Sequence, residues 1–160
     1  MTDTAAPGPI VAWTDGSCLG NPGAGGWCWW VSERCWAAGG SDRSTNNAME
    51  LTAVLELLKA SRPAAGRPLH IKADSKYVID ACTRWIHGWK RNGWKTKDKK
   101  PVANRELMEA LDAELAGRTV TFEWVRGHNG EAGNELVDTR AREQAAAAQS
   151  GQAGRVGTHA

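Results

Sequence analysis

One segment of the chain carries a clear helical period. Apolar side chains recur there at positions i, i+3, i+4 and i+7, namely Leu51, Val54, Leu55 and Leu58. Because an α-helix has 3.6 residues per turn, this spacing places them on one face and predicts a helix over 47–62. Asn47 and Glu50 have the spacing of a capping box, which is typical of a helix start.

Alternating and β-rich stretches predict strands around this helix. Leu69, Ile71 and Ala73 alternate with polar residues as far as Asp74, so a strand is expected to end there. Runs of β-branched and aromatic residues predict four more strands: 10–15, two in a meander over 27–38, and 119–125. Further helices are expected over 75–85, 104–115 and 134–148, with a basic helix and loop reaching 101. This order predicts an α/β fold, a mixed sheet covered by helices.

A chain of 160 residues suits one domain, which we place at 9–145. Small and polar residues predict a disordered N-terminus over 1–8 and a flexible tail over 146–160. The glycines between 16 and 26 match neither a P-loop nor a dinucleotide-binding fingerprint. A turn at Asn21-Pro22-Gly23 is the simpler interpretation of that segment.

Charge is concentrated in one stretch of the sequence. The formal net charge is only +2, yet residues 84–105 hold eight basic side chains and one acid. Trp85, Trp89 and Trp94 are interleaved with them, and aromatic faces beside cations favour nucleic acid as a partner. The alternative is a solvated helix whose tryptophans pack on the sheet. The other six tryptophans fall on predicted strands, where we expect them in the core.

The four cysteines lack the spacing of a zinc site and no secretory leader is evident, so we expect reduced thiols. The longest uncharged stretch, residues 16–32, is broken by five glycines and a proline, which argues against a membrane span. We therefore expect a cytoplasmic protein with no membrane partner.

Four acids stand at the ends of predicted elements: Asp15 and Asp74 end strands, whereas Glu50 and Asp138 begin helices. Each alone could be a turn or capping residue. If the fold brings them together, however, their mutual repulsion requires cations, and oxygen ligands select Mg²⁺ or Mn²⁺. Two such ions about 3.5–4 Å apart can drive phosphodiester hydrolysis. His128, in a glycine-flanked loop, could then carry a proton near neutral pH.

Several motifs in the same order resemble the type 1 ribonucleases H in their bacterial single-domain form. The matching segments are 14–23 (TDGSCLGNPG), 45–51 (TNNAMEL), 74–78 (DSKYV), 124–128 (WVRGH) with Asn134, Glu135 and Asp138, and the basic segment 85–96. The resemblance covers about residues 9–145. It implies a five-stranded mixed sheet with helices on both faces. It also implies endonucleolytic cleavage of the RNA strand of RNA–DNA hybrids, leaving 3′-hydroxyl and 5′-phosphate ends.

The resemblance also implies a role for each matching residue. Two Mg²⁺ ions, with Mn²⁺ as a possible substitute, would be held by Asp15, Glu50, Asp74 and Asp138, and His128 would assist proton transfer or product release. Glu50 would also sense a ribose 2′-hydroxyl. The minor-groove surface would comprise Cys18, Asn21, Asn46 and Asn47. A DNA phosphate would be held by Arg43, Thr45 and Asn104, and the DNA channel edged by Trp85 and Trp89. Apart from the resemblance, the basic stretch 84–105 offers Lys95, Lys97, Lys99 and Lys100 for contacts to phosphates. Lys76 stands where some members carry Gln.

Two other functions remain open at this stage. The same sheet supports nucleases that cut DNA, because a fold does not fix a function. A non-catalytic hybrid-binding module could use the basic segment alone, although the presence of all four acids and His128 argues against it. We expect the protein to act as a monomer on its hybrid substrate.

Overall fold

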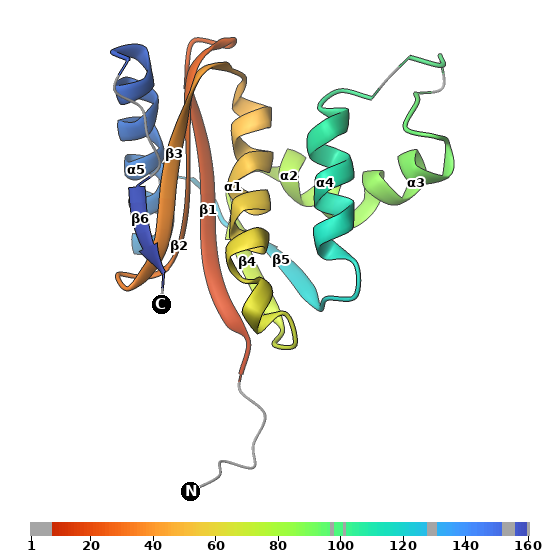
Figure 1. Cartoon of the computed structure of the whole chain (residues 1–160), viewed down its shortest axis with the longest axis horizontal. Helices are drawn as coiled ribbons and strands as arrows, with labels where there is room; N and C mark the ends of the chain where they lie inside the picture. Colours follow the sequence, from red (N-terminus) through yellow and green to blue (C-terminus); the bar gives the residue numbers. More distant parts are fainter. Residues whose placement is uncertain (1–7, 97, 101, 128–130, 152–155, 160) are drawn as a thin grey trace, which may run out of the picture.

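The computed structural model describes residues 8–96, 98–100, 102–127, 131–151 and 156–159. Its centre is a mixed sheet in the order β5-β4-β1-β2-β3-β6 (Figure 1). The strands are β1 (Ile10–Leu19), β2 (Gly23–Ser32), β3 (Cys35–Ser44), β4 (Leu69–Ala73), β5 (Val120–Trp124) and β6 (Val156–His159). The first three form an antiparallel meander, whereas β4 and β5 run parallel to β1.

Helices cover both faces of the sheet, so the expected α/β architecture is confirmed (Figure 1). One face carries α1 (Asn46–Ala60), with α4 (Arg105–Leu115) beside it, and the other carries α5 (Ala132–Gln149). The connections are a 3₁₀ turn η1 (Arg62–Ala64), α2 (Lys76–Asp80), a π-helical turn η2 (Ala81–Trp85) and α3 (Ile86–Arg91).

The predicted helix over 47–62 is α1, and its apolar stripe forms the centre of the larger core. Leu51, Val54 and Leu58 are fully buried against the sheet. Thr45 is the residue that caps this helix, because its Oγ1 accepts the Ala48 N–H at 3.1 Å. The alternation predicted for β4 is also confirmed, since its three apolar residues are buried.

The sheet differs from the expected five strands because β6 pairs antiparallel with β3. Residues 146–149 likewise continue α5, so the segment predicted as a flexible tail contributes both helix and strand. Pairing with β3 explains why β6 forms. Without β6, the backbone N–H and C=O groups along the outer side of β3 would lack hydrogen-bond partners at the edge of the sheet. Of the N-terminus predicted to be disordered, only Gly8 lies within the described residues.

Glycine in the strands lets both layers of helices approach the sheet closely. The strands extend past the predicted bounds at 15 and 27, because the chain turns only at 20–22, beside the predicted turn at Asn21-Pro22-Gly23, and is strand on either side. A Cβ atom at Gly16 would lie 2.4 Å from the Glu50 backbone nitrogen in α1. A Cβ atom at Gly26 would lie 2.0 Å from the Ala141 carbonyl oxygen in α5. The glycines are therefore packing positions.

We expect Gly26→Ala to destabilise the protein by about 1–3 kcal/mol, because the added methyl group meets helix backbone that cannot rotate away. Thermal denaturation should show a melting temperature several degrees below that of the unsubstituted protein. Gly66→Ala is the matched control, since no heavy atom lies within 4 Å of its added Cβ. Equal melting temperatures for the two variants would contradict the close packing of α5.

Candidate active site

Two neighbouring parallel strands and one helix bring three acids together. The pairing of β1 with β4 sets Thr14 opposite Ala73, so Asp15 and Asp74 follow at the same edge of the sheet. Glu50 comes from the first turns of α1, which rests on Gly16. One carboxylate oxygen from each acid lies within 4.8 Å of those of the other two.

Burial gives this cluster unusual electrostatics. Asp15 is 3% exposed and Glu50 8% exposed. Burial, and then the charge of Glu50, raise the pKa of Asp15 above its ordinary value. Burial likewise raises the pKa of Glu50, and Asp74 adds to the effect. Three close carboxylates in this environment cannot all ionise without a compensating cation.

The residues present fit a hard divalent cation. Glu50 Oε2 is buried and accepts no hydrogen bond from the described residues, so its lone pairs are available to a ligand. Asp15 Oδ1 accepts the Gly16 N–H at 2.9 Å, which fixes that side chain. Oxygen-only donors of negative charge are the ligands that Mg²⁺ and Mn²⁺ prefer.

Asp138 lies near the three acids, but it is not part of the group whose carboxylate oxygens lie within 4.8 Å of one another. Its carboxylate pairs with Arg142 Nη2 at 3.0 Å, one turn along α5. Its charge nevertheless contributes to the raised pKa values of Asp15 and Glu50, although it is the last of the causes at both. The structure thus assembles three of the four predicted acids and places the fourth within electrostatic reach.

His128 lies outside the described residues. The chain leading to it passes the cluster, because a Cβ atom at Gly127 would lie 3.1 Å from Asp74 Oδ2. The Val125 N–H also donates to the Ala73 carbonyl at 2.9 Å, which anchors the start of this loop to β4.

Comparison with known proteins agrees with this geometry. The RNase H family model matches residues 7–146. The ribonuclease H of Tropheryma whipplei (strain Twist) is 47% identical over 136 residues, which cover 85% of this chain and 84% of that protein. That of Rhodospirillum rubrum is 48% identical over 148 residues, covering 89% and 87%. The chain belongs to the ribonuclease H family. It is therefore a metal-dependent nuclease, and the resemblance deduced from the sequence motifs is confirmed.

Solved structures of ribonucleases H share the architecture. LC9-RNase H1, described as a type 1 RNase H with the type 2 active-site motif, is 30% identical with a TM-score of 0.75. That match covers 97% of this chain and 80% of the other. LC11-RNase H1, solved in complex with an RNA/DNA hybrid, is 16% identical with a TM-score of 0.61, covers 83% of this chain and 94% of the other, and shows the shared fold alone.

Trp124 lies beside Asp74, although the sequence analysis expected it in the core. Its strand position suggested the core, but 43% of it is exposed, because β5 is an edge strand and Trp124 ends it. The indole Nε1 donates to the Asp74 carbonyl at 3.2 Å, and Lys76 Nζ lies 4.5 Å from the ring centroid. An exposed aromatic–cation pair therefore borders the acids. The signal available in the sequence was that Trp124 lies near the end of its predicted strand, shortly before the loop that contains His128.

The residues expected at the minor-groove surface gather at the other rim of the cluster. Asn21 Oδ1 accepts the Asn46 N–H at 3.1 Å, which ties the β1–β2 turn to the start of α1. The Cys18 thiol lies 3.7 Å from the Gly23 carbonyl, and burial raises its pKa. Asn47 is exposed on the first turn of α1, and Arg43 is exposed near the end of β3.

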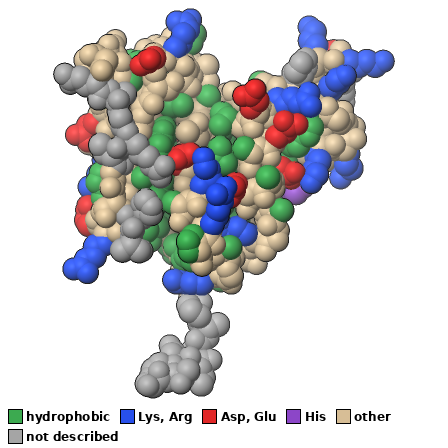
Figure 2. All heavy atoms as spheres, viewed as in Figure 1, with side chains coloured by type: hydrophobic (Ala, Val, Ile, Leu, Met, Phe, Trp, Pro, Cys, Tyr) green, Lys and Arg blue, Asp and Glu red, His purple; other side chains and the backbone are tan. Residues whose placement is uncertain are grey.

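The basic segment forms a projecting lobe. Lys and Arg side chains gather on the lobe at the upper right of Figure 2, where Figure 1 shows α3 and the loop to α4. Lys95, Lys99 and Lys100 are exposed, whereas Lys97 lies outside the described residues. The half-buried rings of Trp85 and Trp89 are 5.7 Å apart, and Asn104 Nδ2 donates to the Tyr77 hydroxyl at 3.2 Å.

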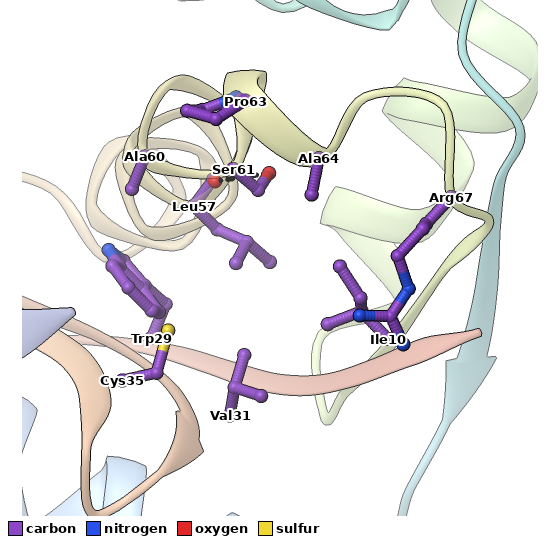
Figure 3. Close-up of a pocket in the computed structure, with 10 residues that line it drawn as sticks. All are labelled: Ile10, Trp29, Val31, Cys35, Leu57, Ala60, Ser61, Pro63, Ala64 and Arg67. Carbon is purple, nitrogen blue, oxygen red and sulfur yellow. Dashed lines mark hydrogen bonds between the residues drawn. The ribbon is translucent and has the colours of Figure 1, made fainter. Parts of the chain in front are cut away.

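A separate apolar cavity of about 470 Å³ opens between β1, β2 and the end of α1 (Figure 3). Its lining includes Ile10, Val31, Leu57 and Arg67 and holds no carboxylate. Ile10 begins the strand on which Asp15 lies five residues later, so the cavity is remote from the acids.

Among the described residues, no helix has the length and apolar character needed to cross a membrane.

We expect Asp15→Asn to raise the melting temperature of the EDTA-treated protein at pH 8 by a few degrees. With pKa values raised by burial, Asp15 and Glu50 hold protons in the folded state that the unfolded chain releases above about pH 4. The folded state then binds more protons, so this contribution to stability falls as pH rises toward the raised pKa values. The gain from the substitution should vanish near pH 4.

The exposed variant Asp42→Asn is the control and should leave the melting temperature unchanged at both pH values. A lower melting temperature for Asp15→Asn than for the unsubstituted protein at pH 8 would show that the buried Asp15 carboxyl does not destabilise the metal-free protein, and would contradict this account.

Proposed function

We propose that this ribonuclease H hydrolyses the RNA strand of RNA–DNA hybrids at the Asp15–Glu50–Asp74 cluster. The observation that carries the proposal is the meeting of three acids, two of them buried, from separate elements of the fold, with their oxygens within 4.8 Å. Cleavage is endonucleolytic and leaves 3′-hydroxyl and 5′-phosphate ends.

In this proposal the three acids, joined by Asp138, hold two Mg²⁺ ions, and Mn²⁺ can replace them. When bound, such ions activate a water molecule and stabilise the leaving oxygen of a phosphodiester. The protein's own contribution is to hold four oxygen donors in place before the substrate arrives. Asp138, whose carboxylate pairs with Arg142 Nη2 at 3.0 Å, offers a further oxygen ligand at the rim.

Two residues then act on the substrate itself. Glu50 Oε2, which has no hydrogen-bond partner among the described residues, is available to accept a hydrogen bond from a ribose 2′-hydroxyl. That hydroxyl is what distinguishes RNA from DNA. His128 takes or delivers a proton near neutral pH, or assists product release.

Residues around the cluster bind the duplex through contacts that do not depend on its base sequence. Minor-groove contacts come from Cys18, Asn21, Asn46 and Asn47. Contacts to the DNA strand come from Arg43, Thr45, Asn104, Trp85 and Trp89, and further phosphate contacts from Lys95, Lys97, Lys99 and Lys100. Phosphate contacts fix register, while the 2′-hydroxyl identifies the strand to be cut. The protein acts as a monomer in the cytoplasm.

One assay separates this function from its alternatives. End-labelled RNA–DNA hybrid, double-stranded RNA and double-stranded DNA are each incubated with Mg²⁺ or with chelator. We expect cleavage of the hybrid alone and only with Mg²⁺. Cleavage of double-stranded DNA would indicate a DNA nuclease of the same fold, and binding without cleavage would indicate a hybrid-binding module.

We expect Asp74→Asn to abolish hybrid cleavage while leaving hybrid binding intact. The amide keeps the volume of the side chain but removes one charge from the cluster. Cleavage of labelled hybrid and a binding titration measure the two effects separately. Asp80→Asn, which alters an acid paired with Arg84 outside the cluster, should cleave normally. Residual turnover of Asp74→Asn within tenfold of the unsubstituted protein would reject the metal-site assignment.

Replacing Lys95, Lys97, Lys99 and Lys100 together by Ala should raise KM and leave kcat nearly unchanged. Lys95, Lys99 and Lys100 are exposed on the loop between α3 and α4, so the substitutions should remove binding made equally in ground and transition states. The slope of log K against log salt should become shallower by roughly 0.9 per lost phosphate contact.

The double variant Arg34→Ala with Lys59→Ala shows the effect of removing two positive charges elsewhere, because both side chains are exposed away from this lobe. An unchanged salt slope in the lysine variant would show that the lobe is only a solvated surface.

A further inference from the structure

Another carboxylate, that of Glu131, is held by side chains from the strands that lead to Asp15 and Asp74. Glu131 Oε1 accepts a hydrogen bond from Trp13 Nε1 at 2.7 Å. The same oxygen lies 3.5 Å from Lys72 Nζ. Lys72 in turn stands 5.2 Å from the centroid of the Trp13 ring, so the three side chains contact one another.

The two partners of Glu131 belong to the strands that carry the active-site acids. Trp13 on β1 is paired in register with Lys72 on β4. Two residues further along these strands come Asp15 and Asp74, on the same face because side chains alternate. The acids are therefore the next same-face pair, about 6–7 Å along the sheet.

Glu131 itself stands at the start of the helix that carries Asp138. It is the residue that precedes α5 and makes no capping hydrogen bond with its side chain, which is directed to the sheet instead. Two residues later the backbone of Gly133 rests on the Trp13 indole, where a Cβ atom would lie 2.4 Å from the ring. Asp138 follows on the second turn of the same helix.

Beyond its first turn, α5 packs on the sheet mainly through apolar contacts, with the pairing of Arg140 and Glu33 at its exposed side. Val137 and Ala141 pack against Cys28 and Ala38 in a small apolar cluster on β2 and β3. Such contacts between small apolar groups are non-directional. The bond from Trp13 to Glu131 is directional, and it ties the helix to the strand that carries Asp15.

We propose that Glu131 is a positioning residue that fixes the start of α5 to β1 and β4, and thereby holds Asp138 within electrostatic reach of Asp15 and Glu50. This inference rests on the proposed function, because it assigns Asp138 a part in the metal site. Glu131 is not itself a ligand in this proposal, since its Oε1 already has two partners. Outer partners of this kind typically account for a 10–100-fold change in metal affinity or activity.

The test compares three variants in hybrid cleavage with Mg²⁺. Glu131→Ala should lower kcat by about tenfold with KM for the hybrid unchanged, because no duplex contact is lost. Glu131→Gln should stay within about threefold of the unsubstituted protein, since its amide oxygen still accepts the Trp13 N–H. Trp13→Phe, which keeps an aromatic body and loses the donor, should reproduce the loss and serves if Glu131→Ala fails to fold.

Glu33→Ala is the matched control. It breaks another contact of α5, the pairing of Arg140 with Glu33 at 3.1 Å, far along the helix from Glu131. We expect its kcat to be unchanged. Glu131→Ala in an Asp138→Asn background should cause no further loss, because the two substitutions act on the same group.

Calorimetric titration of the free protein with Mg²⁺ provides a readout without turnover, and Glu131→Ala should weaken binding by about tenfold. Unchanged Mg²⁺ affinity and kcat in Glu131→Ala, a loss as large in Glu33→Ala, or failure of Glu131→Gln to restore kcat would each overturn the inference. Failure of the proposed function looks different: the unsubstituted protein would then cleave no hybrid, while the calorimetry would still test the role of Glu131.

Discussion

Repulsion among three close carboxylates is the constraint on which the rest of the structure depends. Asp15, Glu50 and Asp74 bring negative charge into a partly buried space, where like charges disfavour one another and burial disfavours each. When all three are ionised, the carboxylates repel one another unless a cation is bound. The carboxylates must therefore be held by the packing of the elements that carry them, and the energy for this comes from the apolar core between α1 and the sheet.

That packing depends on backbone positions as much as on side chains. Glycine at positions 16 and 26 allows α1 and α5 to lie directly on the strands, so that acids from a strand and a helix can meet. The parallel pairing of β1 with β4 sets Asp15 and Asp74 side by side. Around them, Arg142 pairs with Asp138, and Trp13 with Lys72 holds Glu131, so each neighbouring acid has a cationic or donor partner.

Periodicity alone predicted the elements that bury one face. The leucine stripe of α1 and the alternation of β4 were sufficient because each reflects burial against one partner surface. The convergence of the acids was conditional, since it depends on topology that no local pattern encodes; the motif resemblance supplied it. The strand ends within 16–26 and the strand β6 were missed for different reasons. Glycine carries no β signal of its own, so the sequence did not show that β1 and β2 continue to their hairpin turn. The strand β6 depends on pairing with β3, which is distant in sequence.

The most direct measurement of the central claim is a crystal structure of the protein grown with Mn²⁺, with anomalous scattering used to locate the ions. If the carboxylates are held together to bind divalent cations, the strongest anomalous peaks will lie between Asp15, Glu50 and Asp74, with Asp138 at the rim. Their oxygens should then coordinate the ions directly. Ordered carboxylates with no anomalous peak between them, or peaks only elsewhere on the surface, would contradict the account.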